Sequence, residues 1–244
     1  MATKMEHTRR VRHIRHIRKQ LEKLKAIKRK SYHALVHQIH KKHKISKKTL
    51  FYVKEYGPRS NVPRTIIKES IRIMLLASII SSLGGLAIEN IKTIFISITP
   101  LIILLPSLNG MIGDFGAIVS SRFSAMLHEG KIKRDWWKNT ELKRLFAQVL
   151  IVSLIAVALT CVAALLFSNW SAYKATSTTV TKIFLIAVID VILLVLLLFL
   201  TSIFAGFYVY RKKEDPNNFL IPITTSIADF GNMIILSVLV TALF

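Results

Sequence analysis

Asp229 lies inside the last apolar stretch of the chain, residues 219–244. No lysine or arginine follows Lys213, so no cation from this end of the sequence is available to neutralise the carboxylate. A carboxylate in hydrocarbon costs roughly 3 kcal/mol or more unless it faces a partner, water or an ion. Helix packing alone does not call for an acid. The residue type and its place therefore predict a functional site in a membrane.

Two further carboxylates, Asp114 and Asp190, fall within apolar stretches. Small, amide and hydroxyl residues flank both Asp114 and Asp229: Asn109, Gly110, Gly113, Gly116, Ser120 and Ser121 near the first, and Thr224, Thr225, Ser226, Gly231 and Asn232 near the second. Carboxylate, amide, hydroxyl and backbone oxygens without thiolates suit a hard cation such as Mg²⁺. Asp190 has aliphatic neighbours instead. Two interpretations of this residue remain open: a buried group that carries a proton, or a contact at an interface.

Composition divides the chain into a basic part and an apolar part. The 244 residues are 52% hydrophobic, yet their formal net charge is +22. Residues 1–72 hold 22 lysines and arginines against four glutamates, so 18 of the 22 net positive charges lie there. The rest consists mostly of apolar runs of membrane-spanning length. The single cysteine, Cys161, excludes an internal disulfide and argues against a Cys/His metal site, and no signal-peptide pattern is present.

Five apolar segments are expected to cross the membrane as helices: 71–88, 94–127, 145–167, 183–208 and 219–244. The second is too long and too interrupted for one plain helix, so we expect it to be broken or locally unwound. The residues that interrupt it are Pro100, Pro106, Gly110, Gly113 and Gly116. Lysine and arginine concentrate in cytoplasmic loops. The basic loops 131–144 and 211–213 then fall on the same side as the basic N-terminus, with the C-terminus outside the cell membrane.

The predicted fold is an all-α membrane protein in two parts. A basic, His-rich cytoplasmic helical arm occupies residues 1–65, and a five-helix transmembrane ion-transport domain occupies residues 66–244. Three functions are possible for the arm: it binds nucleic acid, it lies on anionic lipid, or it keeps the N-terminus in the cytoplasm. Next to a membrane domain, the last two are favoured. His33, His37 and His40 share one helical face, and the many flanking cations favour a solvated face over a metal cluster.

A symmetric dimer is expected because one five-helix bundle has little interior for a pore. Two protomers would build a central path from the same helices of each, here the second and fifth segments. The partner is an identical chain or a paralogue.

The last segment resembles that of the MgtE-type magnesium channels and transporters, most closely the animal solute-carrier branch. The likeness lies in Asp215-Pro216-Asn217-Asn218-Phe219-Leu220-Ile221-Pro222, followed by Thr225 and Asp229. Pro100-Leu101-Ile102 and the run from Gly113 to Ser124 resemble the family's second segment. The resemblance implies an MgtE-like membrane domain, with Asp229 as the main ion ligand in a dimer's central pore.

Two departures from the family pattern matter. Asp114 stands where the family carries an asparagine, which adds a negative charge, and the N-terminal part is too short for the family's Mg²⁺-sensing regulatory module. The predicted metal-site residues are Asp229, Asp114, Thr225, Asn109 and Gly113. The expected transported ion is Mg²⁺, with Mn²⁺ and Co²⁺ as alternatives, and no cofactor is expected.

Two other functions compete with transport. A membrane anchor that presents the basic arm to nucleic acid or anionic lipid would leave Asp229 unexplained. An intramembrane aspartyl protease needs Tyr-Asp and Gly-x-Gly-Asp, but Asp190 follows Ile189, and Gly113-Asp114 is preceded by Met111-Ile112. We therefore predict a transporter and not an enzyme.

Overall fold

The structure, a computed structural model, describes residues 19, 32–45, 50, 62–132, 136–171, 173–212 and 215–244. The chain divides into two compact units, residues 1–68 with 125–133, and residues 69–124 with 134–244. Most of the predicted arm, including His7, His13 and His16, lies outside the described residues, so its boundary at residue 65 stays a prediction.

In the first unit, helix α2 (Tyr32–His43) ends in a basic turn. Val36 and Ile39 are buried, whereas His37 is exposed, as expected for a solvated histidine face. The His40 ring nitrogen Nδ1 lies 2.6 Å from the carbonyl oxygen of Ile45. The side chain of His33 lies outside the described residues.

Five long helices dominate the described residues, and the prediction of five spans is confirmed by length and composition. They are α4 (Val62–Glu89), α6 (Thr99–His128), α7 (Thr140–Trp170), α8 (Ser177–Lys212) and α9 (Pro216–Leu243). The candidate span in α4 is Ser70–Glu89, and each of the other four helices is also long enough, and contains an apolar stretch long enough, to cross a membrane. At 1.5 Å per residue, each apolar stretch reaches about 30 Å or more, the thickness of the hydrocarbon core. No strand occurs among the described residues.

The second segment is broken, but not where its glycines suggested. A short helix, α5 (Lys92–Ser97), is separated from α6 by the non-helical residue Ile98. Helix α6 then runs without interruption through Pro106, Gly110, Gly113 and Gly116. The expectation of unwound backbone near the glycines was therefore wrong. In hydrocarbon each unpaired backbone group is costly, so a helix continues through residues that would weaken it in water.

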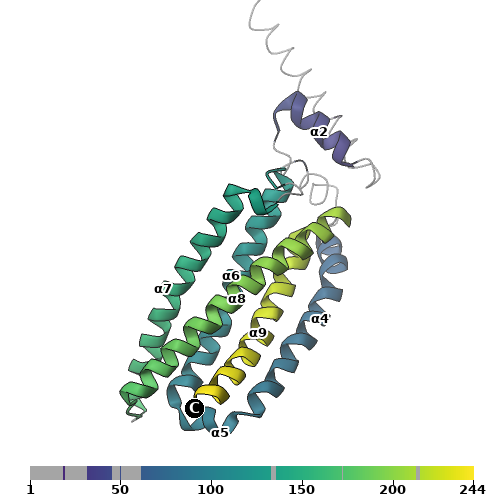
Figure 1. Cartoon of the computed structure of the whole chain (residues 1–244). Helices are drawn as coiled ribbons and strands as arrows, with labels where there is room; N and C mark the ends of the chain where they lie inside the picture. The colour runs from purple at the N-terminus through teal and green to yellow at the C-terminus, as the bar shows by residue number, and fades with distance from the viewer. Residues whose placement is uncertain are drawn as a thin grey trace, which may run out of the picture. The chain divides into compact units, whose positions relative to one another are not determined.

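The long helices of the second unit form a bundle in which α4 lies beside α9 at one edge and α7 beside α8 at the other (Figure 1). Glycines set three of the contacts between helices. A Cβ at Gly84 of α4 would lie 3.2 Å from the Cα of Phe230 in α9. One at Gly116 of α6 would meet Thr224 of α9 and Leu198 of α8, and one at Gly231 of α9 would meet Leu194 of α8. Small residues of this kind let membrane helices approach closely.

Tryptophans mark both ends of α7, as at the two interfaces of a membrane. The 3₁₀ helix η2 (Trp136–Lys138) precedes α7, and the Trp136 ring contacts Phe204 edge-on at 6.2 Å between centroids. Trp170, at the far end, is exposed. The η2 end also carries Lys138, Lys143, Arg144, Arg211 and Lys212. The aromatic and basic residues thus agree with a membrane-spanning bundle.

Candidate functional site

Asp229 lies at the middle of α9, thirteen residues after Pro216 and fourteen before Leu243. About 20 Å of helix therefore extends on either side. Its Oδ2 accepts a hydrogen bond of 3.1 Å from the hydroxyl of Ser81 in α4. The carboxylate is partly exposed, and among the described residues no basic side chain forms an ion pair with it. It is thus a mid-membrane acid with one neutral partner and room for another.

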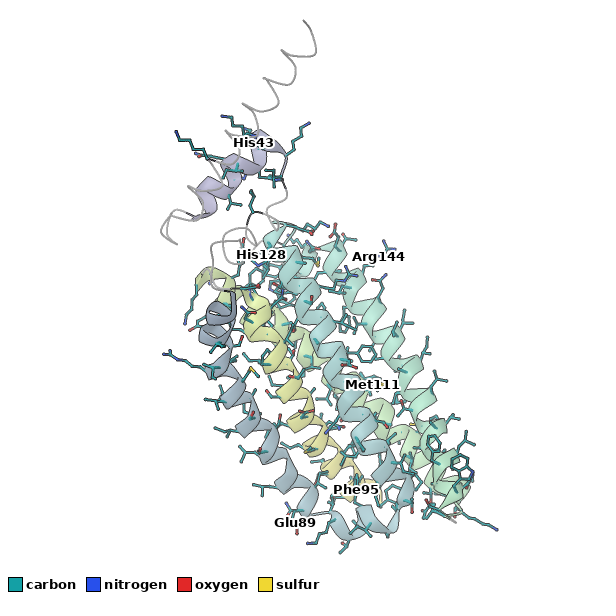
Figure 2. The ribbon with its side chains drawn as sticks, turned by 180° about the vertical axis from the view of Figure 1, so that it is seen from behind. His43, Glu89, Phe95, Met111, His128 and Arg144 are labelled. Atoms are coloured by element: carbon teal, nitrogen blue, oxygen red, sulfur yellow. The ribbon has the colours of Figure 1, made fainter. Side chains whose placement is uncertain are left out.

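Asn109 of α6 faces Asn232 of α9, one turn beyond Asp229. The side-chain amide of Asn232 donates a hydrogen bond to Oδ1 of Asn109. Asn232 is fully buried, and its own Oδ1 has no hydrogen-bond partner. Figure 2 shows Glu89 and Phe95 at one end of the bundle and Arg144 at the other, with Met111 between them. The amide pair therefore lies at middle depth, two residues along α6 from Met111.

Gly113 and Thr225 meet between α6 and α9 on the other side of Asp229. A Cβ at Gly113 would lie 3.9 Å from Cγ2 of Thr225. The Thr225 hydroxyl donates to the backbone carbonyls of Ile221 at 3.0 Å and Pro222 at 3.1 Å. Its oxygen lone pairs remain available to a cation or its water, because a hydroxyl accepts as well as donates.

Asp114 lies on the exposed face of α6, unlike its neighbour Gly113, which is buried. In the described part of the chain it makes no ion pair. The face it occupies also carries Ser107, Gly110 and Ser121, all exposed and spaced three to seven residues apart. Within one chain, the structure thus does not bring Asp114 together with Asp229, which points toward α4.

An open cavity of about 540 Å³ lies between α4 and α9. Its lining residues are Met74, Ala77, Ser78, Ser81, Ile221, Pro222, Thr225 and Ser226. Ser81 both lines this cavity and binds Asp229. The cavity therefore extends from the Pro222 half of α9 to Ser81, the hydrogen-bond partner of the carboxylate.

Behind this surface, three buried hydroxyls tie α6, α8 and α9 together. The Ser120 oxygen lies 3.2 Å from that of Ser202 and 3.1 Å from that of Thr224. Ser202 and Thr224 also donate to the carbonyls of Leu198 and Leu220 in their own helices. All three side chains are fully buried. They fix how the helices that carry the site pack.

Ser81 was not predicted from the sequence, although among the described residues it is the side chain that donates a hydrogen bond to Asp229. Its signal is a row of small residues in α4, Ser78, Ser81 and Gly84, at three-residue spacing. Such a row marks the helix face that packs closely on another helix, but the sequence does not say which helix that is.

The donor set fits a hard, hydrated cation. Among the described residues, no three acidic, histidine or cysteine side chains gather as they would around a tightly held metal. Isolated carboxylates with amide, hydroxyl and carbonyl oxygens suit an ion that keeps part of its water shell, as Mg²⁺ does.

Comparison with protein families matches residues 105–239 to the family of MgtE divalent cation transporters. This range takes in most of α6, all of α7 and α8, and α9 to Leu239, and it excludes α4. The comparison with curated proteins found no match, and neither did the comparison with solved structures. The likeness to the animal solute-carrier branch stays a prediction. Because the family match covers more than half of the chain, this integral membrane protein belongs to the MgtE family of divalent cation transporters.

Proposed function

We propose that this protein moves Mg²⁺ through a pore on the twofold axis of a dimer, with Asp229 as the principal ligand. Asp114, Thr225, Asn109 and Gly113 supply the remaining oxygens, by side chain or backbone, directly or through the ion's water. Mn²⁺ and Co²⁺ are the alternative ions, since the same oxygens bind them. No catalytic residue and no cofactor enter this function.

The observation that carries the proposal is the exposed carboxylate of Asp114 in a membrane span. Facing lipid, it would cost several kcal/mol. Facing the same helix of a second protomer across water, it would attract cations along the path. A second chain against the exposed face of α6 would therefore cover a carboxylate that a single bundle leaves exposed within a membrane span.

Charge arithmetic favours a dimer as well. Two Asp229 carboxylates, one from each protomer, balance one divalent ion, and two Asp114 carboxylates add a second anionic ring. Attraction of this kind is poorly screened in low dielectric. An identical partner is the simplest arrangement, and a paralogue with the same acids would serve equally.

We infer the orientation of the bundle in the membrane from its basic residues. Arg144 and Arg211 lie at the η2 end of the bundle, so this end faces the cytoplasm and the C-terminus lies outside the cell membrane. The cavity between α4 and α9 would then be the cytoplasmic approach to Asp229. Residues 1–65 form the cytoplasmic arm and contact anionic lipid, and residues 66–244 form the transport domain.

Two measurements test the dimeric pore. Purified full-length protein in liposomes should admit Mg²⁺ to an internal fluorescent indicator, while empty liposomes should not. In a Cys161→Ala background, Asp114→Cys should join two protomers through a short bifunctional thiol reagent. Ile151→Cys, exposed on α7, is the matched control and should stay monomeric on denaturing gels. Equal linking at both positions, or at Ile151 only, would refute a pore lined by α6.

A further inference from the structure

Asp190 is an acid that the proposed ion path does not use. It lies in α8, is fully buried within the chain, and neither carboxyl oxygen has a hydrogen-bond partner. An ionised carboxylate in such a place costs many kcal/mol, so the group stays neutral or acquires a partner. The smallest ligand that satisfies this site is a proton.

The contacts of α8 show what Asp190 faces. Residues four apart form one row on a helix, and the row through Asp190 continues with Leu194, Leu198, Ser202 and Gly206. Leu194 packs on Gly231 of α9, Leu198 on Gly116 of α6, and Ser202 bonds to Ser120 of α6. Asp190 is therefore directed into the junction of α6, α8 and α9, one turn before Leu194.

No charged side chain of the described spans faces this junction. On α6, Asp114 and Arg122 are exposed, and on α9 Asp229 turns to Ser81. The charged residues of α7 (Glu141, Lys143 and Arg144) lie in its first turns. On α8 itself, Lys182 lies eight residues before Asp190, about 12 Å along the helix, and Arg211 lies 21 residues after it, about 31 Å.

A neutral group that can bond a protonated Asp190, the side-chain amide of Asn232, does lie at this junction. Leu194 meets α9 beside Asn232, at Gly231, so Asp190 lies within about one turn of the Asn232 amide. Asn232 Oδ1 is a buried acceptor without a donor, and a protonated Asp190 is a donor without an acceptor. One hydrogen bond, direct or through one water, satisfies both. Asn232 Nδ2 already bonds Asn109, so the chain would join α8, α9 and α6.

We propose that Asp190 is a proton-binding site whose O–H donates to Asn232, and that each protomer releases this proton to the side from which a divalent cation enters and takes up another from the side to which the cation leaves. The coupling, though not the proton site, rests on the function proposed above. Asn232 lies three residues from Asp229 on α9, so a movement of this helix on cation binding would also move the Asn232 acceptor relative to Asp190. Loss of H⁺ leaves a carboxylate, which needs a conformation open to water. Two protons from a dimer balance one divalent cation, which makes the exchange electroneutral.

Infrared spectroscopy of the full-length protein in lipid tests the proton site without any transport. The wild type at neutral pH should show the C=O stretching band of a protonated carboxylic acid, and Asp190→Asn should lose it. Glu89→Gln removes an exposed carboxylate at the end of α4 and should keep the band. A band that survives in Asp190→Asn, or no such band in the wild type, overturns the site. If the variant fails to fold, the absence of this band from the wild-type spectrum would still overturn the proton site.

Proton counting in liposomes tests the coupling. Mg²⁺ uptake by the wild type should release about two protons per ion to the outside solution, and uptake should not depend on membrane potential. Mg²⁺ uptake without proton release, or with Na⁺ efflux in its place, overturns the coupling. If Asp229→Asn transports at the full rate, the ion-site assignment fails, but the infrared band still decides the nature of Asp190.

Discussion

Replacing Gly84 by leucine should separate α4 from α9, whereas the same change at Gly85 should not. A Cβ at Gly84 would lie 2.8 Å from the Met233 sulfur, which can move, and 3.2 Å from the Cα of Phe230, which cannot move alone. Overpacking of this kind costs about 1–3 kcal/mol. At Gly85 a Cβ meets nothing within 4 Å. Both changes remove a helix glycine, so the gain in helix propensity cancels in the comparison.

The assay is unfolding in mixed micelles with a rising fraction of SDS, followed by Mg²⁺ uptake of both variants in liposomes. Gly84→Leu should be about 1–3 kcal/mol less stable than Gly85→Leu. Its uptake should also fall, because Ser81 lies one turn away and would lose its hydrogen bond to Asp229. Equal stability of the two variants would refute the close approach of α4 and α9.

Two other predictions concern the surroundings of Asp229. Ser81→Cys should react with a water-soluble methanethiosulfonate, and Mg²⁺ should slow the reaction, because Ser81 lines the cavity beside the carboxylate. Ser82→Cys, exposed on a different face of α4, should show no protection by Mg²⁺, and equal protection would contradict this assignment. Ser120→Ala and Thr224→Val should couple by about 0.6 kcal/mol in a double-mutant cycle of unfolding, the average for membrane hydrogen bonds. Strict additivity would mean that the 3.1 Å contact contributes nothing.

The five spans could be predicted from the sequence because length and hydropathy are local properties. The break in the second segment was predicted, and it falls at Ile98, two residues before Pro100, which was one of the residues named as interrupting it. By helix propensities measured in water, Pro106 and Gly110 are expected to break a helix. In the structure α6 continues through both, and the non-helical residue is Ile98, between α5 and α6. In hydrocarbon, backbone hydrogen bonding decides over propensity.

The sequence also predicted that the acidic residues within the spans have a functional role. It did not predict which side chains surround them. A carboxylate in an apolar run is visible in any sequence. Whether it is exposed, as Asp114 is, or fully buried, as Asp190 is, depends on how the helices rotate about their axes. The Ser81 partner of Asp229 comes from a helix 148 residues away in the chain, and no local pattern specifies that contact.

The most direct test of the central claim is the rate of Mg²⁺ entry into liposomes that contain Asp229→Asn, compared with wild type at equal protein content. The amide keeps the shape of the side chain and removes its charge. Entry should be abolished or strongly reduced, while expression and dimer formation stay near normal, because a divalent ion in low dielectric needs opposing charge. Entry at the full wild-type rate would contradict this claim, since Asp229 would then not be the ligand on which the proposed pore depends.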